Sequence, residues 1–150
     1  MKAKGLSLSE VMLVLALGAV IMIVAAHYYS QVRESEKITT LLGQINSIID
    51  AAGKCVAGNA GNASSTQNNI TTCLTLTTLI SEDFLSTYYT TSPWGTITGV
   101  PANNNTAIQI TANNVPNNAC LAMESRLNAE GNQEVFVSCA NNTITVTASY

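Results

Sequence analysis

The hydrophobic pattern of the N-terminal third of the chain changes once, close to Tyr28. Before this point, Val11–Ala26 contains no charged side chain and almost no polar one. With Leu6 and Leu8 it approaches the ~20 residues that a membrane-spanning helix needs. After it, apolar residues recur at three- and four-residue steps, which is the pattern of an amphipathic helix. We therefore predict one helix from about Leu6 to Ala57, roughly 75–80 Å long at 1.5 Å per residue.

The second half of this predicted helix has two different sides. The apolar side consists of Val32, Ile38, Leu41, Leu42, Ile45, Ile48, Ile49, Ala52 and Val56, and the polar side of Arg33, Glu34, Glu36, Lys37, Thr40, Gln44 and Asp50. Only about 30 Å of the helix would lie in the hydrocarbon core of a bilayer. The remainder is predicted to be a spine onto which a globular domain packs.

The rest of the chain alternates loops with short regular segments. Gly58–Asn69 is rich in Gly, Asn, Ala and Ser and is typical of a loop. Ser81 is a candidate N-cap for a short helix through residues 82–85, and residues 116–128 favour another short helix. Alternating polar and apolar residues with many β-branched side chains predict strands at 96–100, 106–112, 134–140 and 143–148. Asn141-Asn142, between the last two strands, is a candidate hairpin turn.

The cysteines all follow the apolar segment, at Cys55, Cys73, Cys120 and Cys139. Four cysteines allow three connectivities. We favour Cys55–Cys73 with Cys120–Cys139, because each pair closes a loop of about 20 residues and could contribute about 3 kcal/mol. The spacings do not resemble zinc motifs and no histidine lies near them. Paired disulfides indicate an oxidising compartment.

Charged residues make up 10% of the chain, against about 25% in a typical domain. The net charge is −3, and loss of Lys2 and Lys4 would change it to −5. The other basic residues are scattered, at Arg33, Lys37, Lys54 and Arg126. This distribution argues against nucleic acid as the main partner, because a phosphate-binding domain usually carries a basic patch.

No residue pattern indicates catalysis, so we expect neither an enzyme, nor a metal site, nor a cofactor. His27 is the only histidine, and with Tyr28 and Tyr29 it is interpreted as an interfacial residue. Glu82-Asp83 is interpreted as the acidic first turn of a helix rather than as a metal site. Asn-x-Ser/Thr sequons occur at Asn62, Asn69, Asn104 and Asn141, as an Asn- and Thr-rich surface produces by chance.

The segment before the apolar run has a specific arrangement. In Lys2-Ala3-Lys4-Gly5-Leu6-Ser7-Leu8-Ser9-Glu10, two lysines and a glycine come first and a single carboxylate lies just inside the apolar run. The lysines place the N-terminus in the cytoplasm by the positive-inside tendency. A charged side chain near the bilayer centre costs roughly 2.5–3.5 kcal/mol on insertion scales. Glu10 lies near the end of the segment but still needs a partner.

This arrangement resembles the prepilin signal of type IV pilins. The resemblance implies cleavage by a prepilin peptidase between Gly5 and Leu6, N-methylation of Leu6, and Glu10 as the glutamate of the fifth mature position. The ammonium group created on Leu6 would be neutralised by Glu10 of an adjacent subunit, so that neither charge stays unpaired in apolar surroundings. A first mature residue other than phenylalanine is more typical of the type IVb branch.

Two later elements resemble PilS-type pilins, which are type IVb subunits of thin conjugative pili and their relatives. Ser92-Pro93-Trp94-Gly95 leads into a predicted strand, and Val115-Pro116-Asn117-Asn118-Ala119-Cys120 looks like the helix start before a cysteine. Trp94 is also interpreted as a core aromatic, with the proline and glycine setting the turn. The resemblance implies the α+β type IV pilin fold. In this fold, the long N-terminal helix consists of a membrane-spanning half and an amphipathic half. It packs on a small antiparallel β-sheet, and the fold contains two disulfides.

The same resemblance implies an organisation and a function. The expected parts are a leader peptide (1–5), a transmembrane and polymerisation helix (6–27), a spine helix (28–57) and a globular head (58–150). The expected protein is the structural subunit of a type IVb pilus that serves adhesion, cell contact or conjugation. Its precursor would cross the inner membrane once, and its partners would be the prepilin peptidase, the pilus assembly platform and other copies of itself in an extracellular fibre. No direct nucleic-acid site is predicted.

Several alternatives share parts of this pattern. A minor pilin or a type II secretion pseudopilin has the same architecture, although the disulfides and the PilS-like elements disfavour the pseudopilin. A membrane-tethered periplasmic binding module is the alternative from another class. An ordinary secretory signal would need a small-residue cleavage site, which Val24-Ala25-Ala26 imitates weakly. Gly18 would permit close helix contact or local melting, or is a plain small residue of a membrane helix.

Overall fold

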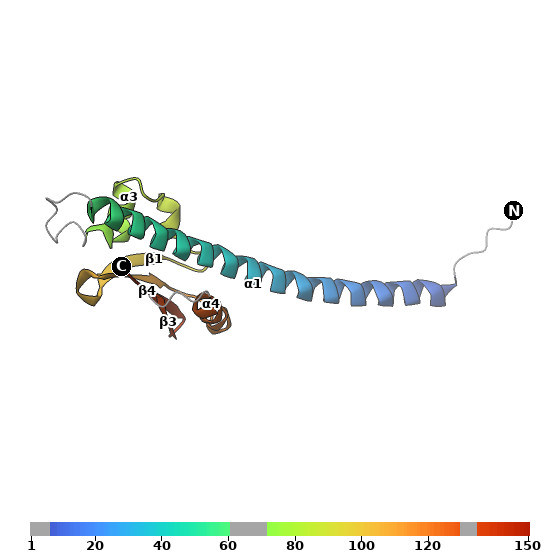
Figure 1. Cartoon of the computed structure of the whole chain (residues 1–150). Coiled ribbons are helices and arrows are strands. Elements are labelled where there is room, and N and C mark those ends of the chain that lie inside the picture. The colour runs from blue at the N-terminus through green and yellow to red at the C-terminus, as the bar shows by residue number, and fades with distance from the viewer. Residues whose placement is uncertain (1–6, 61–71, 130–134) are drawn as a thin grey trace. The chain divides into compact units, whose positions relative to one another are not determined.

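The computed structural model describes residues 7–60, 72–129 and 135–150 (Figure 1). The chain divides into two units, Met1–Glu36 and Lys37–Tyr150. Helix α1, Leu8–Ala60, provides the described helical residues of the first unit and continues as the first element of the second. The predicted helix from about Leu6 to Ala57 is therefore confirmed within a few residues at each end.

In the second unit, one side of α1 is buried in the core. Its buried residues include a series at steps of three and four, namely Ile38, Leu41, Ile45, Ile48, Ala52 and Cys55. This spacing returns each side chain to the same face of a helix with 3.6 residues per turn. The predicted apolar stripe is confirmed here, whereas Val32 is exposed in the first unit.

Within the described ranges, the sheet has four strands in the order β1-β2-β4-β3, and every neighbouring pair is antiparallel. Its strands are β1 (Ile97–Ala102), β2 (Ala107–Ala112), β3 (Val135–Ala140) and β4 (Thr143–Ser149). The predicted strands are confirmed with shifts of one or two residues. Because side chains alternate across a strand, one face of the sheet is apolar and the other carries mostly threonine and serine.

The register aligns the apolar residues in rows across the sheet. Ile110 pairs with Val146, which pairs in turn with Val137, and the first two side chains are fully buried. On the opposite face, Thr111 and Ser138 both pair with Thr145. The apolar face belongs to one core cluster with the buried stripe of α1. In Figure 1 the green, C-terminal part of α1 lies along the sheet.

Short elements complete the second unit. They are α3 (Leu76–Ser81), the 3₁₀ turns η1 (Thr87–Thr90) and η2 (Asn103–Asn105), and α4 (Asn117–Ala129). Helix α4 lies beside β3, as Figure 1 shows, and buries Ala119, Cys120, Met123 and Leu127. Asn141 and Asn142 have φ of 50° and 58°, as expected for a two-residue hairpin turn between β3 and β4. The chain is thus a long helix packed on an antiparallel sheet, in agreement with the α+β prediction.

The prediction for Ser81 was wrong. Ser81 is the last residue of α3, and its hydroxyl donates to the backbone oxygen of Thr78 instead of capping a new helix. Glu82-Asp83 therefore follow the C-terminus of a helix and do not form its acidic first turn. Serine and acidic residues usually mark a helix start, but burial of Leu76 and Leu79 places the helix before them.

Candidate functional site

The first described residues form a helix cap that involves Glu10. The carboxylate oxygen Oε2 of Glu10 accepts a 3.0 Å hydrogen bond from the backbone N–H of Ser7, and the Ser7 carbonyl accepts from Glu10 N–H at 2.9 Å. This is the glutamate half of a capping box, in which the third helical residue reaches back to the N-cap. The positive end of the helix dipole also favours a carboxylate at this position. Within one chain, Glu10 therefore already has a hydrogen-bond partner. Gly5 and Leu6, the predicted cleavage and methylation residues, lie outside the described residues.

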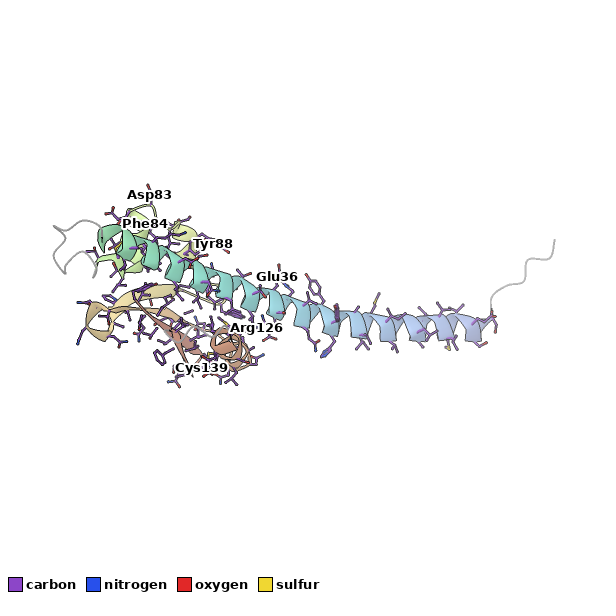
Figure 2. All side chains as sticks on the ribbon, in the orientation of Figure 1. Glu36, Asp83, Phe84, Tyr88, Arg126 and Cys139 are labelled. Carbon is purple, nitrogen blue, oxygen red and sulfur yellow. A yellow bond between two sulfur atoms is a disulfide. The ribbon has the colours of Figure 1, made fainter. Side chains whose placement is uncertain are left out.

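Beyond this cap, the first unit presents an apolar helix surface, whose side chains are drawn as sticks in Figure 2. Its exposed large side chains are Leu8, Val11, Met12, Leu13, Val14, Leu15, Leu17, Val20, Ile21, Met22, Ile23 and Val24. Glu10 is the only charged residue between Leu8 and Ala26. In the described part of the chain, α1 is the one helix long and apolar enough to cross a membrane. A Cβ added at Gly18 would meet nothing within 4 Å, so this position offers room for a close neighbour.

Polar and aromatic residues follow the apolar surface. Nε2 of Gln31 lies 3.2 Å from Nε2 of His27, and the Ser30 hydroxyl donates to the His27 carbonyl at 2.8 Å. The Arg33 guanidinium lies 5.6 Å from the centre of the Tyr29 ring. Such amphipathic side chains suit the boundary between a bilayer and water.

The disulfides join Cys55 to Cys73 and Cys120 to Cys139, so the favoured pairing is confirmed. The first ties the spine part of α1 to the segment that precedes α3. The second ties α4 to the edge strand β3. Each bridge thus connects an element of regular structure to a part of the chain that is 18 or 19 residues away. No described cysteine is free, and the described residues contain no group of three or more side chains that could hold a metal ion.

The Ser92–Gly95 element is a tight turn organised by a buried serine. Ser92 Oγ accepts hydrogen bonds from the backbone N–H groups of Gly95 at 2.8 Å and Trp94 at 3.2 Å. The Ser92 N–H donates to the Gly95 carbonyl at 2.7 Å. A Cβ at Gly95 would lie only 2.8 Å from the backbone oxygen of Asn113, so no larger residue fits there without a shift. The turn is therefore fixed by its serine and its glycine together.

This turn is anchored to the spine of α1 by two contacts. The Lys37 ammonium group lies 5.9 Å from the centre of the Trp94 ring, and Gln44 Nε2 donates a 3.0 Å hydrogen bond to the Thr91 carbonyl. Gln44 is 3% exposed, and its Oε1 has no hydrogen-bond partner among the described residues, although the sequence pattern assigned Gln44 to the polar side of the helix. That assignment was wrong because the Thr91 segment covers this side of the helix. Trp94 is half-buried and packs against the core, as its interpretation as a core aromatic expects.

The Val115–Cys120 element also lies against the core. Val115 is fully buried and its N–H donates to the Asn142 carbonyl at 2.8 Å, which links this segment to the β3–β4 turn. The Pro116 carbonyl accepts the Cys120 N–H at 2.9 Å and so begins the hydrogen-bond ladder of α4. Both elements that resemble PilS-type pilins therefore position chain segments around the sheet. Comparison with known proteins finds no matching family model, no curated relative and no similar solved structure.

Proposed function

We propose that this chain is the structural subunit of a type IVb pilus, made as a membrane-anchored precursor and polymerised into an extracellular filament. The observation that carries the proposal is Glu10, the single acid at the start of an exposed apolar helix. The same helix continues into a spine that packs on a disulfide-bonded sheet. A soluble domain rarely leaves such a long apolar surface uncovered. Membrane insertion would cover this apolar surface in the precursor, and packing against the helices of other subunits would cover it in the filament.

Glu10 would act in assembly through its charge. In one chain its carboxylate accepts the Ser7 N–H, which leaves most of its hydrogen-bonding capacity unused. Cleavage after Gly5 would create an ammonium group on Leu6, and N-methylation would keep that positive charge. Insertion of the apolar helix into the filament core would then pair this group with Glu10 of a neighbouring subunit. A pair of this kind offsets the cost of burying either charge alone.

The disulfide-bonded part of the chain suits exposure to the medium. The sheet strands contain no charged residue, and their solvent-facing positions are largely threonine and serine. The disulfides fit an oxidising compartment. In the proposed fibre this part would face outward and serve adhesion, cell contact or conjugation.

The first experiment is mass spectrometry of the N-terminus of the protein purified from its own cells. A chain that begins with N-methylated Leu6 is the expected result. Gly5→Ser should block this processing, which a shift to the precursor on a gel would reveal. A mature N-terminus near His27 would instead indicate ordinary secretion and contradict the proposal.

Electron microscopy of material sheared from the cell surface is the second experiment. Filaments that contain this chain as the main component support a major pilin. A chain that is processed after Gly5 but found only at trace levels in filaments would be a minor pilin. A processed or unprocessed chain that stays in the membrane as a monomer would favour a tethered binding module.

A further inference from the structure

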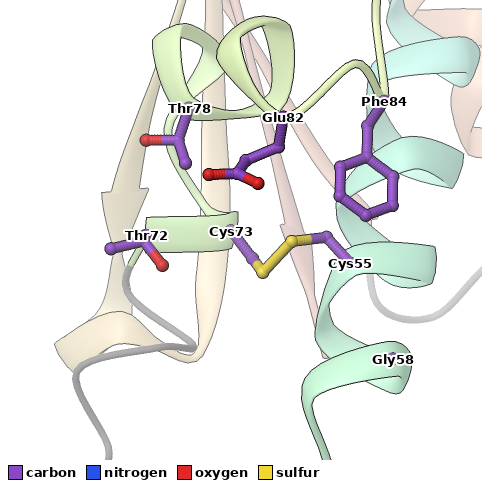
Figure 3. A pocket seen from close by; sticks show the side chains of 7 residues that line it. All are labelled: Cys55, Gly58, Thr72, Cys73, Thr78, Glu82 and Phe84. Carbon is purple, nitrogen blue, oxygen red and sulfur yellow. A yellow bond between two sulfur atoms is a disulfide. The ribbon is translucent and has the colours of Figure 1, made fainter.

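A cavity of about 400 Å³ lies next to the Cys55–Cys73 disulfide, in the second unit (Figure 3). Its lining consists of Cys55, Gly58, Thr72, Cys73, Thr78, Glu82 and Phe84. In Figure 3 the Glu82 carboxylate lies between Thr78 and the Phe84 ring and above the disulfide. The volume is within the range of small-molecule sites, or of a site for one side chain of a partner.

The end of α3 brings Glu82 and Phe84 to the same cavity. The Phe84 N–H donates to the Leu79 carbonyl at 2.9 Å and the Asp83 N–H to the Ile80 carbonyl at 3.2 Å. These two bonds form a Schellman motif, with Asp83 in the left-handed conformation at φ 59°. The motif reverses the chain within one residue. The side chains before and after Asp83 therefore both line the cavity, and Asp83 does not.

The Glu82 carboxylate is the charged acceptor of this cavity, and no hydrogen bond or ion pair holds it within the described part of the chain. Thr78 also lines the cavity, but Figure 3 shows its hydroxyl oxygen on the side away from Glu82. The Thr75 hydroxyl donates its proton to the Thr72 carbonyl at 2.9 Å, so in its 2.7 Å contact with Thr78 it must accept. Thr78 thus uses its only hydroxyl proton for Thr75 and leaves the Glu82 carboxylate without a donor from this side chain.

The third wall is aromatic. Phe84 is 44% exposed, and its ring borders the cavity beside the Glu82 carboxylate. The ring offers apolar surface that the alkyl chain of a ligand would cover. The described residues that line the cavity include no lysine or arginine.

We propose that this cavity binds a primary ammonium group, either of a lysine side chain on a partner protein or of a free alkylamine. An ammonium group carries three donors and a positive charge, which matches the Glu82 carboxylate. Its alkyl chain would contact the Phe84 ring and the disulfide. The net negative charge of the chain would favour the approach of such a cation.

The test uses the full chain, labelled with ¹⁵N and held in uncharged detergent at neutral pH. It is titrated with Nα-acetyl-lysine N-methylamide, with n-butylammonium, and with the norleucine analogue that lacks the charge. Saturable shifts of the amide signals of Thr78, Glu82 and Phe84 with the two amines, and none with norleucine, are expected. Tighter binding of the lysine compound identifies a peptide ligand, and equal binding identifies recognition of the ammonium group alone. Absence of saturable shifts with both amines overturns the proposal.

Matched variants separate the cavity from the general charge of this segment. Glu82→Gln and Phe84→Leu should each weaken binding, the first by tenfold or more. Asp83→Asn removes a neighbouring charge, keeps a residue that tolerates the left-handed conformation, and should change binding less than twofold. Unchanged signals of the sheet residues verify that each variant is folded. Equal losses in Glu82→Gln and Asp83→Asn would contradict a specific site.

Discussion

The phenolic hydroxyl of Tyr150 donates a 2.6 Å hydrogen bond to the backbone oxygen of Ile49 in α1. The ring lies against Gly53, where an added Cβ would be 3.3 Å from the ring carbon Cε1. The backbone N–H of Tyr150 donates to the Thr106 carbonyl at 2.9 Å. Tyr150 therefore connects the segment after β4 both to the spine helix and to the turn before β2. Figure 1 shows the C-terminus beside this part of the helix.

Tyr150→Phe should lower the free energy of unfolding by about 1 kcal/mol at neutral pH, because one hydrogen bond is lost while the ring remains. Burial raises the pKa of the Tyr150 hydroxyl above its ordinary value of about 10, and the Asp50 carboxylate raises this pKa further. The fold thus favours the neutral phenol. Its contribution is complete below about pH 10 and is lost as the pH rises from there toward the pKa of the folded state.

Unfolding followed by circular dichroism at pH 7, 9 and 11, on the full chain in detergent, checks this prediction. The difference in stability between wild type and Tyr150→Phe should be constant from pH 7 to 9 and smaller at pH 11. A difference that stays the same at pH 11 would show that the hydroxyl does not titrate as its burial implies.

Glu10→Gln should leave membrane insertion unchanged but reduce filament yield at least tenfold. Glutamine keeps an oxygen that can accept the Ser7 N–H, so the helix cap survives while the charge is lost. Membrane fractionation and quantification of sheared filaments measure the two effects. Glu36→Gln, on the same helix but beyond the apolar segment, is the matched control. A normal yield of filaments from Glu10→Gln would refute the role of the charge pair.

Gly95→Ala should destabilise the second unit by roughly 1–3 kcal/mol, because its Cβ would approach the Asn113 carbonyl to 2.8 Å. Gly43→Ala is the opposite case. Gly43 is exposed in the middle of α1 and has nothing within 4 Å of an added Cβ, so alanine should stabilise the helix by roughly 0.5–1 kcal/mol. Thermal unfolding of both variants measures whether each substitution lowers or raises the stability. If both substitutions act in the same direction, the close contact at Gly95 is not what requires glycine there.

Asp83→Gly should stabilise the turn after α3. A residue with a side chain pays a steric cost in the left-handed conformation, whereas glycine does not. Part of this gain is offset by the greater freedom of glycine in the unfolded chain, so the expected net effect is about 0.5 kcal/mol. Asp83→Ala should be less stable than wild type, since alanine tolerates this conformation less well than aspartate. A melting temperature that falls from Asp83→Gly through wild type to Asp83→Ala verifies the Schellman motif. If Asp83→Ala has the highest melting temperature of the three, the motif is contradicted.

Regular elements with strong periodicity were predictable from the sequence. The three- and four-residue spacing from Ile38 to Cys55 fixes which side of the helix is buried, because helix geometry is local. The strands and the Asn141-Asn142 turn follow from alternation and turn propensity. The favoured disulfide pairing was also correct, since both bridges close short loops.

Predictions failed where a distant segment changes the environment of a residue. Gln44 belongs to the polar side of the helix by pattern, but the Thr91 segment buries it. Ser81 and the acids after it have the composition of a helix start, but packing of Leu79 and Leu85 in the core makes them a helix end. The sequence also gave no sign that Tyr150 bonds to Ile49, a contact between residues 101 positions apart.

Periodicity, composition and short separation along the chain were enough to predict the long helix, the four strands, the favoured cysteine pairing and the isolated acid in the apolar segment. The packed fold was needed to show which polar groups become buried, how Ser92 and Gly95 form the turn against α1, and that Glu82 and Phe84 share a cavity. The physical reason is that these contacts join segments whose approach is set by packing of the whole core, which no local pattern encodes.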